Sequence, residues 1–148
     1  MTGIDTRQGW MGLLARAPAM ALAELWAGFG AEPGFSWLRP PETGAVMVRG
    51  RMGGTGAAFN LGEMTVTRCV LKLDEGGAVG HACVQGRDRD KARRAALIDA
   101  LMQTGRAEDC RSKVLGPLAA RMEEAGRARA ARAAATKVEF FTMVRGED

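Results

Sequence analysis

The chain has 148 residues, of which 47% are hydrophobic and 26% are charged, and these proportions exclude wholesale disorder. Its length suits a single domain over residues 1–148, which we divide into a helical arm over 1–30 and an α+β core over 45–148. The 21 lysines and arginines exceed the 17 aspartates and glutamates, so the net charge of +4 permits a phosphate-bearing partner without demonstrating one.

Two short helices are predicted at the start of the chain. Apolar residues recur at helical spacing before and after Pro18, up to about Gly30. Residues 31–43 are predicted to form a connection with a short extended piece, because the Pro40–Pro41 pair is incompatible with a helix interior. We expect other chains to cover part of the apolar faces of the two helices, which carry Trp10, Leu14, Trp26 and Phe29, and part of a closing strand at Phe140–Phe141.

A central antiparallel sheet is predicted from three segments of alternating polarity. These segments cover residues 45–51, 65–73 and 78–86. The glycines of a turn over residues 74–77 join the last two strands as a hairpin. Pairing across this turn places Arg68 opposite Cys83 and gives the sheet one polar and one apolar face.

The rest of the chain is predicted to be helical until a last strand. Asp88 caps a helix that runs to about Gln103, and a second helix starts at Glu108. Gly116–Pro117 should interrupt this second helix before it resumes through the alanine-rich residues 125–135. With a closing strand over residues 138–143, the predicted class is α+β: an N-terminal helical pair, a central antiparallel sheet, C-terminal helices and a closing strand.

The segment best suited to bind an anion follows the first strand. Two arginines lead into a glycine-rich loop whose consecutive backbone N–H groups can form a nest for phosphate oxygens. The segment is not a P-loop, because no GK[ST] motif follows. The alternative interpretation is a glycine-rich hairpin turn or bulge without a ligand. The candidate residues, for phosphate binding or for an interface, are Arg49, Arg51, Gly53, Gly54, Thr55 and Gly56.

Three further residues are candidates for the same roles. Arg68 and His81 lie on the polar face of the predicted sheet, and a surface or interface role for this single histidine is favoured over that of a catalytic base. Arg87 precedes a helix start, where exposed amides attract anions, although self-capping by Asp88 is the favoured explanation of the sequence there. The basic residues between 106 and 137 indicate a solvated helix face or an acidic partner, since a chain without tyrosine is poorly suited to stack nucleic-acid bases.

The composition also limits the metal chemistry and the location of the protein. Cys69, Cys83 and Cys110 are odd in number and widely spaced, so we expect core or interface cysteines and no disulfide framework or metal site. No apolar run approaches the roughly 18 residues that a membrane span needs. The first residues carry no basic region leading into an apolar stretch, which favours a cytoplasmic protein.

Five segments of the chain resemble the PhnG family, the small G subunit of the bacterial carbon-phosphorus lyase core complex. They are RQGWM (7–11), RGRMGGTGAAFNLGEMTVTR (49–68), VQGRD (84–88), ALIDALMQ (96–103) and KVEFFTMVRGED (137–148). Ala58 departs from the family, in which proline is frequent there, and Cys83 stands where the family has a larger aromatic residue.

The resemblance implies that the chain acts with the H and I subunits and the L protein. Together they transfer the ribose 5-triphosphate unit of ATP to an alkylphosphonate such as methylphosphonate and release adenine. The J subunit, which later cleaves the carbon-phosphorus bond, is a further implied partner, and two copies of the chain are expected per complex. No cofactor is implied for this chain, and the family provides no established catalytic residue. We therefore expect a structural or accessory role and no activity of the chain alone; the alternative is a nucleotide- or phosphate-binding module.

Overall fold

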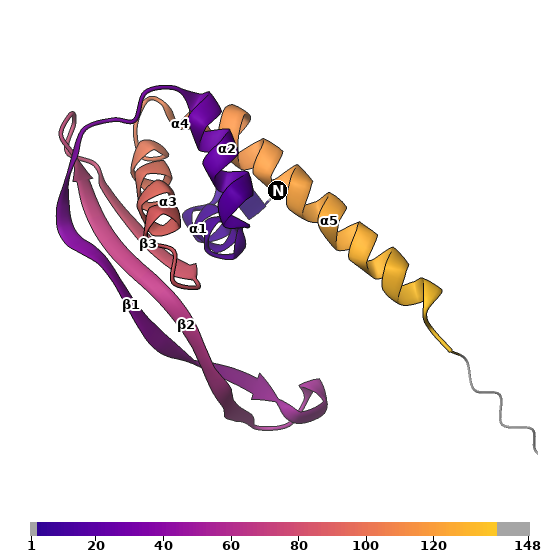
Figure 1. Ribbon diagram of the computed structural model, residues 1–148. Coiled ribbons are helices and arrows are strands. Elements are labelled where there is room, and N and C mark those ends of the chain that lie inside the picture. The colour runs from indigo at the N-terminus through magenta and orange to yellow at the C-terminus, as the bar shows by residue number, and fades with distance from the viewer. Residues whose placement is uncertain (1–2, 139–148) are drawn as a thin grey trace, which may run out of the picture.

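The computed structural model describes residues 3–138, which form a three-stranded antiparallel sheet with helices packed on one face (Figure 1). The predicted α+β class is confirmed, with the helical pair, the antiparallel sheet and the C-terminal helices in the expected order. The predicted closing strand lies, apart from Val138, outside the described residues. The helices and strands are α1 (Arg7–Arg16), α2 (Ala19–Phe29), β1 (Phe35–Arg51), β2 (Ala58–Leu73), β3 (Val79–Gln85), α3 (Arg89–Leu101), α4 (Ala107–Cys110) and α5 (Gly116–Ala135), with short helical turns at Gly3–Asp5 and Met52–Gly54 and a π-helical turn at Arg111–Leu115.

Helices α1 and α2 belong to the hydrophobic core. The hydroxyl of Thr6 accepts a hydrogen bond from the amide of Gly9 and so caps α1, and Pro18 separates the two helices. Both helices contact α3, and α1 also contacts β3 at the edge of the sheet. The expectation that other chains cover their apolar faces is wrong for the largest side chains, because this chain itself buries Trp10, Leu14, Trp26 and Phe29.

Strand β1 is much longer than predicted, because the connection expected over residues 31–43 is extended from Phe35 onward. The strand includes Pro40 and Pro41. It tolerates them because it is an edge strand, and the pairing with β2 shifts register between Arg39 and Glu42. Strand β2 likewise begins earlier than expected, at Ala58.

The predicted register of the β2–β3 hairpin is confirmed. Arg68 lies opposite Cys83, and Val70 lies opposite His81. The side chains that face α3 are buried, whereas those on the outer face of the sheet are largely exposed. The buried set is Cys69, Leu71, Leu73, Ala82 and Val84, and the exposed set includes Arg68, Lys72, His81 and Gln85.

The C-terminal helices begin with α3. A carboxylate oxygen of Asp88 accepts a hydrogen bond from the amide of Lys91, so the predicted cap of α3 is confirmed. After α3, helix α4, the π-helical turn and α5 form a nearly continuous helical rod. The interruption expected at Gly116–Pro117 is wrong, since a π-helical turn leads directly into α5 and Pro117 lies in its first turn, where no amide donor is needed. The alanine-rich half of α5 projects beyond the core and is mostly exposed (Figure 1).

Strands β1 and β2 continue past the end of β3 as a two-stranded ribbon. We call residues 44–65 the ribbon: the end of β1, the turn over residues 52–57 and the first half of β2. Strand β3 pairs with β2 only between Val66 and Lys72, and the ribbon extends past the helices (Figure 1). In the described part of the chain, no helix is long and apolar enough to cross a membrane.

Candidate functional site

The ribbon carries the first group of predicted site residues at its tip. Arg49 and Arg51 are exposed at the end of β1, and the side chains of Val46 and Val48 on the opposite face are half-buried. This is the alternation that the sequence predicts for the strand. Two cations are thus held on one face of a strand, next to the glycine-rich turn.

The turn is closed by its own backbone. The amides of Thr55 and Gly56 both donate to the carbonyl oxygen of Met52, with N···O distances of 3.4 and 3.1 Å. Gly53 and Gly54 have φ angles of 62° and 77°, a conformation that favours glycine. Because two of its amides are engaged within the turn, the observed geometry favours the hairpin-turn interpretation over a nest in which these amides bind an anion.

The two arginines differ in what their side chains contact. Arg51 donates from Nη1 to the carbonyl oxygen of Gly56 at 3.1 Å and so helps to close the turn. The guanidinium of Arg49 forms no hydrogen bond or ion pair with another residue between 3 and 138. A guanidinium can bind phosphate or carboxylate oxygens in a bidentate manner, and Arg49 is the freer of the two for such a contact.

Arg68 and His81 form a second group, on the outer face of the sheet. They lie on neighbouring strands, since Arg68 is paired with Cys83 and His81 with Val70. At about 3.3 Å per residue, Arg68 is roughly 33 Å along β2 from Ala58 at the ribbon tip. One chain therefore does not bring the two groups together around a single triphosphate.

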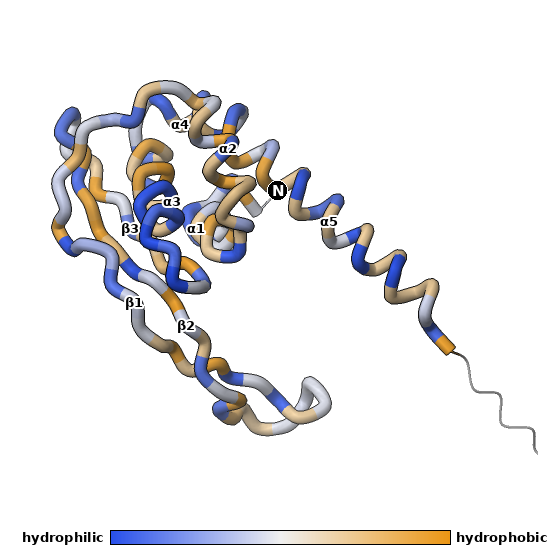
Figure 2. The backbone as a smooth tube through the Cα atoms, in the orientation of Figure 1, coloured by the Kyte–Doolittle hydropathy of each residue, from blue (hydrophilic) through white to orange (hydrophobic). Residues whose placement is uncertain are grey.

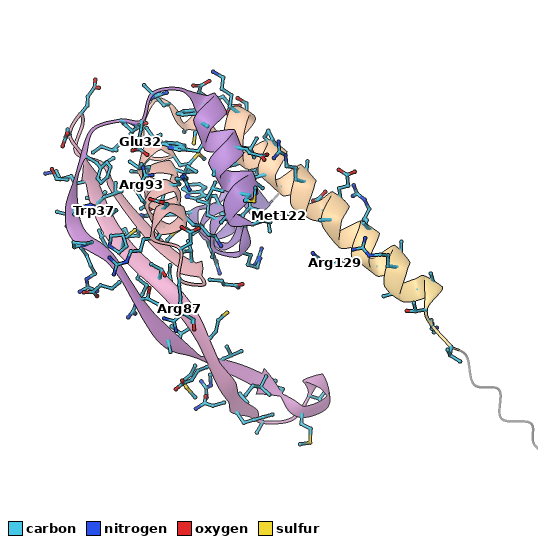
Figure 3. The ribbon with its side chains drawn as sticks, in the orientation of Figure 1. Glu32, Trp37, Arg87, Arg93, Met122 and Arg129 are labelled. Carbon is cyan, nitrogen blue, oxygen red and sulfur yellow. The ribbon has the colours of Figure 1, made fainter. Side chains whose placement is uncertain are left out.

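Arg87 lies in the turn between β3 and α3, away from the ribbon tip (Figure 3). It follows Gly86, whose φ angle of 92° reverses the chain at the end of the sheet. The observed contact at this helix start is the cap made by Asp88, which supports the self-capping interpretation. Arg87 is exposed, and its proposed phosphate role stays a prediction.

Asp99 is the centre of a buried polar cluster that the sequence analysis missed. Its side chain is 0% exposed and accepts four hydrogen bonds. Arg7 donates from Nε at 3.1 Å and from Nη2 at 2.7 Å, Trp10 donates from Nε1 at 2.9 Å, and the backbone amide of His81 donates at 2.9 Å. The hydrogen bond to Asp99 raises the pKa of Arg7 above its usual range. The sequence signal that could have revealed this cluster is Asp99 itself, a single carboxylate within the apolar stripe of ALIDALMQ (96–103).

Lys91 is a second buried charge with a structural role. Its ammonium group donates to the carbonyl oxygens of Ala15 at 3.1 Å and Gln85 at 3.5 Å. Burial lowers its pKa, and the nearby Asp88 carboxylate opposes this shift. The cation lies beside the C-terminal end of α1, where the helix dipole favours positive charge, and ties this helix to the end of β3.

The three cysteines fall into two classes. Cys69 and Cys110 are buried, and burial raises their pKa values to about 11 and about 12, so both are protonated at neutral pH and are poor nucleophiles. Cys83 is exposed on the outer face of the sheet, so of the two expected positions, core or interface, the interface position is the one that stays a prediction for this residue. Together with His81, Cys83 lines a pocket of about 230 Å³ between α1 and β3.

Comparisons with known proteins give the family. Residues 5–146 match the family described as "Phosphonate metabolism protein PhnG". The chain is also 44% identical over 146 residues to "Alpha-D-ribose 1-methylphosphonate 5-triphosphate synthase subunit PhnG" of Rhizobium meliloti (strain 1021), a match that covers 99% of this chain and 93% of the relative. The resemblance inferred from the five sequence segments is confirmed: the chain belongs to the PhnG family.

Proposed function

We propose that this chain is a subunit of an alpha-D-ribose 1-methylphosphonate 5-triphosphate synthase. The observation that carries this proposal is the 44% identity to a relative of that name over nearly the whole of both chains. The reaction transfers the ribose 5-triphosphate unit of ATP to methylphosphonate or a similar alkylphosphonate and releases adenine. We place the complex in the cytoplasm, where ATP is available.

The proposed partners are the H and I subunits and the L protein for this transfer, and the J subunit for the later cleavage of the carbon-phosphorus bond. Two copies of the chain per complex and no cofactor of its own complete the proposal. Within this assembly we assign the chain an accessory role: it organises or completes an active site that belongs mainly to another subunit.

The contacts of the charged side chains support the accessory role. Asp99 and Lys91, both buried, are engaged in holding α1 against the sheet and α3. Arg51 and the amides of Thr55 and Gly56 are engaged in closing the ribbon turn. These groups contribute to the shape of the subunit, and that shape presents a long ribbon to its surroundings.

Reconstitution tests the proposed function. The purified H, I and L proteins are incubated with ATP and methylphosphonate, with and without this chain, and adenine is measured by chromatography. We expect phosphonate-dependent adenine release in the complete mixture, a large loss when this chain is omitted, and none from this chain alone. Adenine release by the isolated chain would contradict the accessory role, and an unchanged rate on omission would contradict the proposed function.

Direct phosphate binding is a second candidate function, favoured by the exposed guanidinium of Arg49, which has no hydrogen-bond or ion-pair partner within residues 3–138. Arg49→Ala tests it more cleanly than a change at Arg51, which closes the turn. For a phosphate ligand, we expect normal assembly and a KM for ATP raised about tenfold or more, since a hydrogen bond to a charged group contributes roughly 1.5–3 kcal/mol. The matched control is Arg39→Ala, an exposed arginine elsewhere on β1. A normal KM for ATP would exclude Arg49 as a ligand.

A further inference from the structure

A pocket rich in arginine lies where α5 meets the first two helices. Its volume of about 140 Å³ is far above the roughly 10–15 Å³ at which a cavity holds one water molecule, so it has room for a phosphate group. Three arginines line it: Arg16 at the end of α1, and Arg121 and Arg129 on α5. The other described residues that line the pocket are apolar, and none is acidic. Figure 3 shows Met122 and Arg129, its labelled members, along α5.

The three arginines of this pocket carry more positive charge than their contacts balance. Arg121 donates from Nη1 to a carboxylate oxygen of Glu24 at 2.9 Å, so its charge is paired. The guanidinium groups of Arg16 and Arg129 form no hydrogen bond or ion pair with another residue between 3 and 138. Both side chains are exposed. Two of the three cations therefore lack a counter-ion within the described chain and are free to bind an anion.

The carboxylates nearest in sequence on α5 do not neutralise the pocket. Glu123 and Glu124 follow Met122, but neither lines the pocket. Glu123 forms an ion pair with Arg127 at 3.9 Å, and at 3.6 residues per turn Arg127 lies on the other side of α5 from Arg129. Residues 125–137 contain basic but no acidic side chains, and Figure 2 shows hydrophilic positions recurring along this half of α5. The surroundings of the pocket thus attract anions.

The start of α2 adds hydrogen-bond donors to the arginines. The first amides of a helix have no intrahelical acceptor, and the residue before α2, Pro18, offers no side chain to cap them. Pro18 and Ala21 of this first turn line the pocket. The positive end of the α2 dipole therefore lies at the same place as the two free guanidinium groups.

The spacing of the arginines favours an elongated anion. Arg121 and Arg129 are eight residues apart on α5, which corresponds to about 12 Å along the helix axis. A chain of phosphates presents anionic oxygens over such a length, whereas a single carboxylate does not. We propose that this pocket binds the phosphate chain of a small molecule, with Arg16 and Arg129 as its main ligands. The choice of a triphosphate rests on the proposed function, in which the transferred ribose unit carries one.

Isothermal titration calorimetry of the full chain with inorganic triphosphate tests this site. The measurement is made at physiological ionic strength, which screens diffuse surface charge. We expect saturable binding of one triphosphate per chain, and a Kd raised about tenfold or more in Arg129→Gln and in Arg16→Gln. Arg127→Gln is the matched control: it removes the same charge from the same helix, two residues away and outside the pocket, and should change the Kd less than about threefold.

Circular dichroism of each variant checks folding, and we expect an unchanged Tm because the three arginines are exposed. If one of the two pocket variants unfolds early, the other provides the same test. The absence of saturable triphosphate binding, or an equal loss of binding in Arg127→Gln, would overturn the proposal.

Two further titrations and a co-purification identify the occupant. We expect ATP to bind about as tightly as triphosphate, and inorganic phosphate to bind more weakly. Equal affinity for inorganic phosphate would overturn the assignment to a phosphate chain. Loss of the partner subunits from tagged Arg129→Gln, with no triphosphate binding by the wild type, would overturn it in favour of a carboxylate of another subunit. None of these results bears on the proposed function, which the release of adenine in the reconstituted mixture tests separately.

Discussion

Asp99 and Arg7 show how single residues hold this fold together. The carboxylate lies within α3 at 0% exposure and accepts hydrogen bonds from α1 and from the backbone of β3. A buried charge is tolerated only when it is paired and hydrogen-bonded, and here both oxygens have partners. Residues that are distant in the sequence therefore depend on one another through one side chain.

We predict that Asp99→Ala lowers the free energy of unfolding by about 3 kcal/mol or more. The change leaves the buried indole N–H of Trp10 and the amide of His81 without their acceptor, and it removes the partner of the Arg7 guanidinium, whose side chain is 45% exposed. Urea denaturation of the isolated chain measures the effect. Glu108→Ala is the control, because Glu108 forms an exposed ion pair with Arg111 and such pairs contribute at most about 1 kcal/mol. Equal effects of the two substitutions would contradict the role assigned to Asp99.

At the scale of elements, β3 and α3 approach each other closely where Gly80 faces the helix. A Cβ at this position would overlap the carbonyl oxygen of Ala96 and would lie 2.9 Å from Cβ of Ala100. The small side chains of α3 and the missing side chain of Gly80 thus bring the helix down onto the sheet. This contact lies beside Asp99 and sets the distance between α3 and β3, at which the Asp99 carboxylate accepts a hydrogen bond from the amide of His81.

We predict that Gly80→Ala destabilises the chain by roughly 1–3 kcal/mol, because the added methyl group meets helix backbone that cannot easily move. Gly62→Ala is the matched control in β2, where an added Cβ finds nothing within 4 Å and stability should be unchanged or slightly raised. Thermal unfolding followed by circular dichroism compares the two. A Tm of Gly80→Ala equal to that of the wild type would show that α3 is not fixed by this contact.

The elements that differ from the sequence prediction do so for local reasons. Pro40 and Pro41 predict a break, because proline has no amide N–H to donate within a sheet. In an edge strand whose register shifts at this point, no hydrogen bond is required from these two positions, so the strand continues. Gly116 and Pro117 also predict a break, but Gly116 still donates its amide to Arg111 across a π-helical turn, and Pro117 needs no donor at the start of α5. In both cases proline does lack an amide donor, as the sequence pattern assumes, but it lies at a position where the structure needs no donor.

At the scale of the whole molecule, two of the five segments that resemble the PhnG family meet in space. RQGWM supplies Arg7 and Trp10, and ALIDALMQ supplies Asp99, so these two segments form one buried cluster. The segment from Arg49 to Arg68 forms the ribbon tip and its return strand. RQGWM and ALIDALMQ thus stabilise the fold, and the segment from Arg49 to Arg68 contributes to a projecting ribbon.

The candidate site could be predicted only in part from the sequence. Alternation along the chain predicted the exposure of Arg49 and Arg51, and hairpin pairing predicted that Arg68 and His81 share the outer face. Neither pattern predicts the distance between the arginines at the ribbon tip and the pair on the outer face, because that distance depends on how far β1 and β2 extend past β3. The engagement of Arg51 with Gly56 is also a matter of turn geometry that spacing does not encode.

Local patterns by themselves determined the class of the fold, the β2–β3 register, the cap of α3 and the family. Each of these depends on residues a few positions apart, or on segments that can be compared directly with relatives. The tertiary structure alone decided that Arg7 pairs with the buried carboxylate of Asp99, that the N-terminal helices bury their apolar faces within the chain, and that the ribbon stands free. These features arise from contacts between residues far apart in the sequence, 92 positions in the case of Arg7 and Asp99, and the energies of such contacts depend on three-dimensional packing and burial.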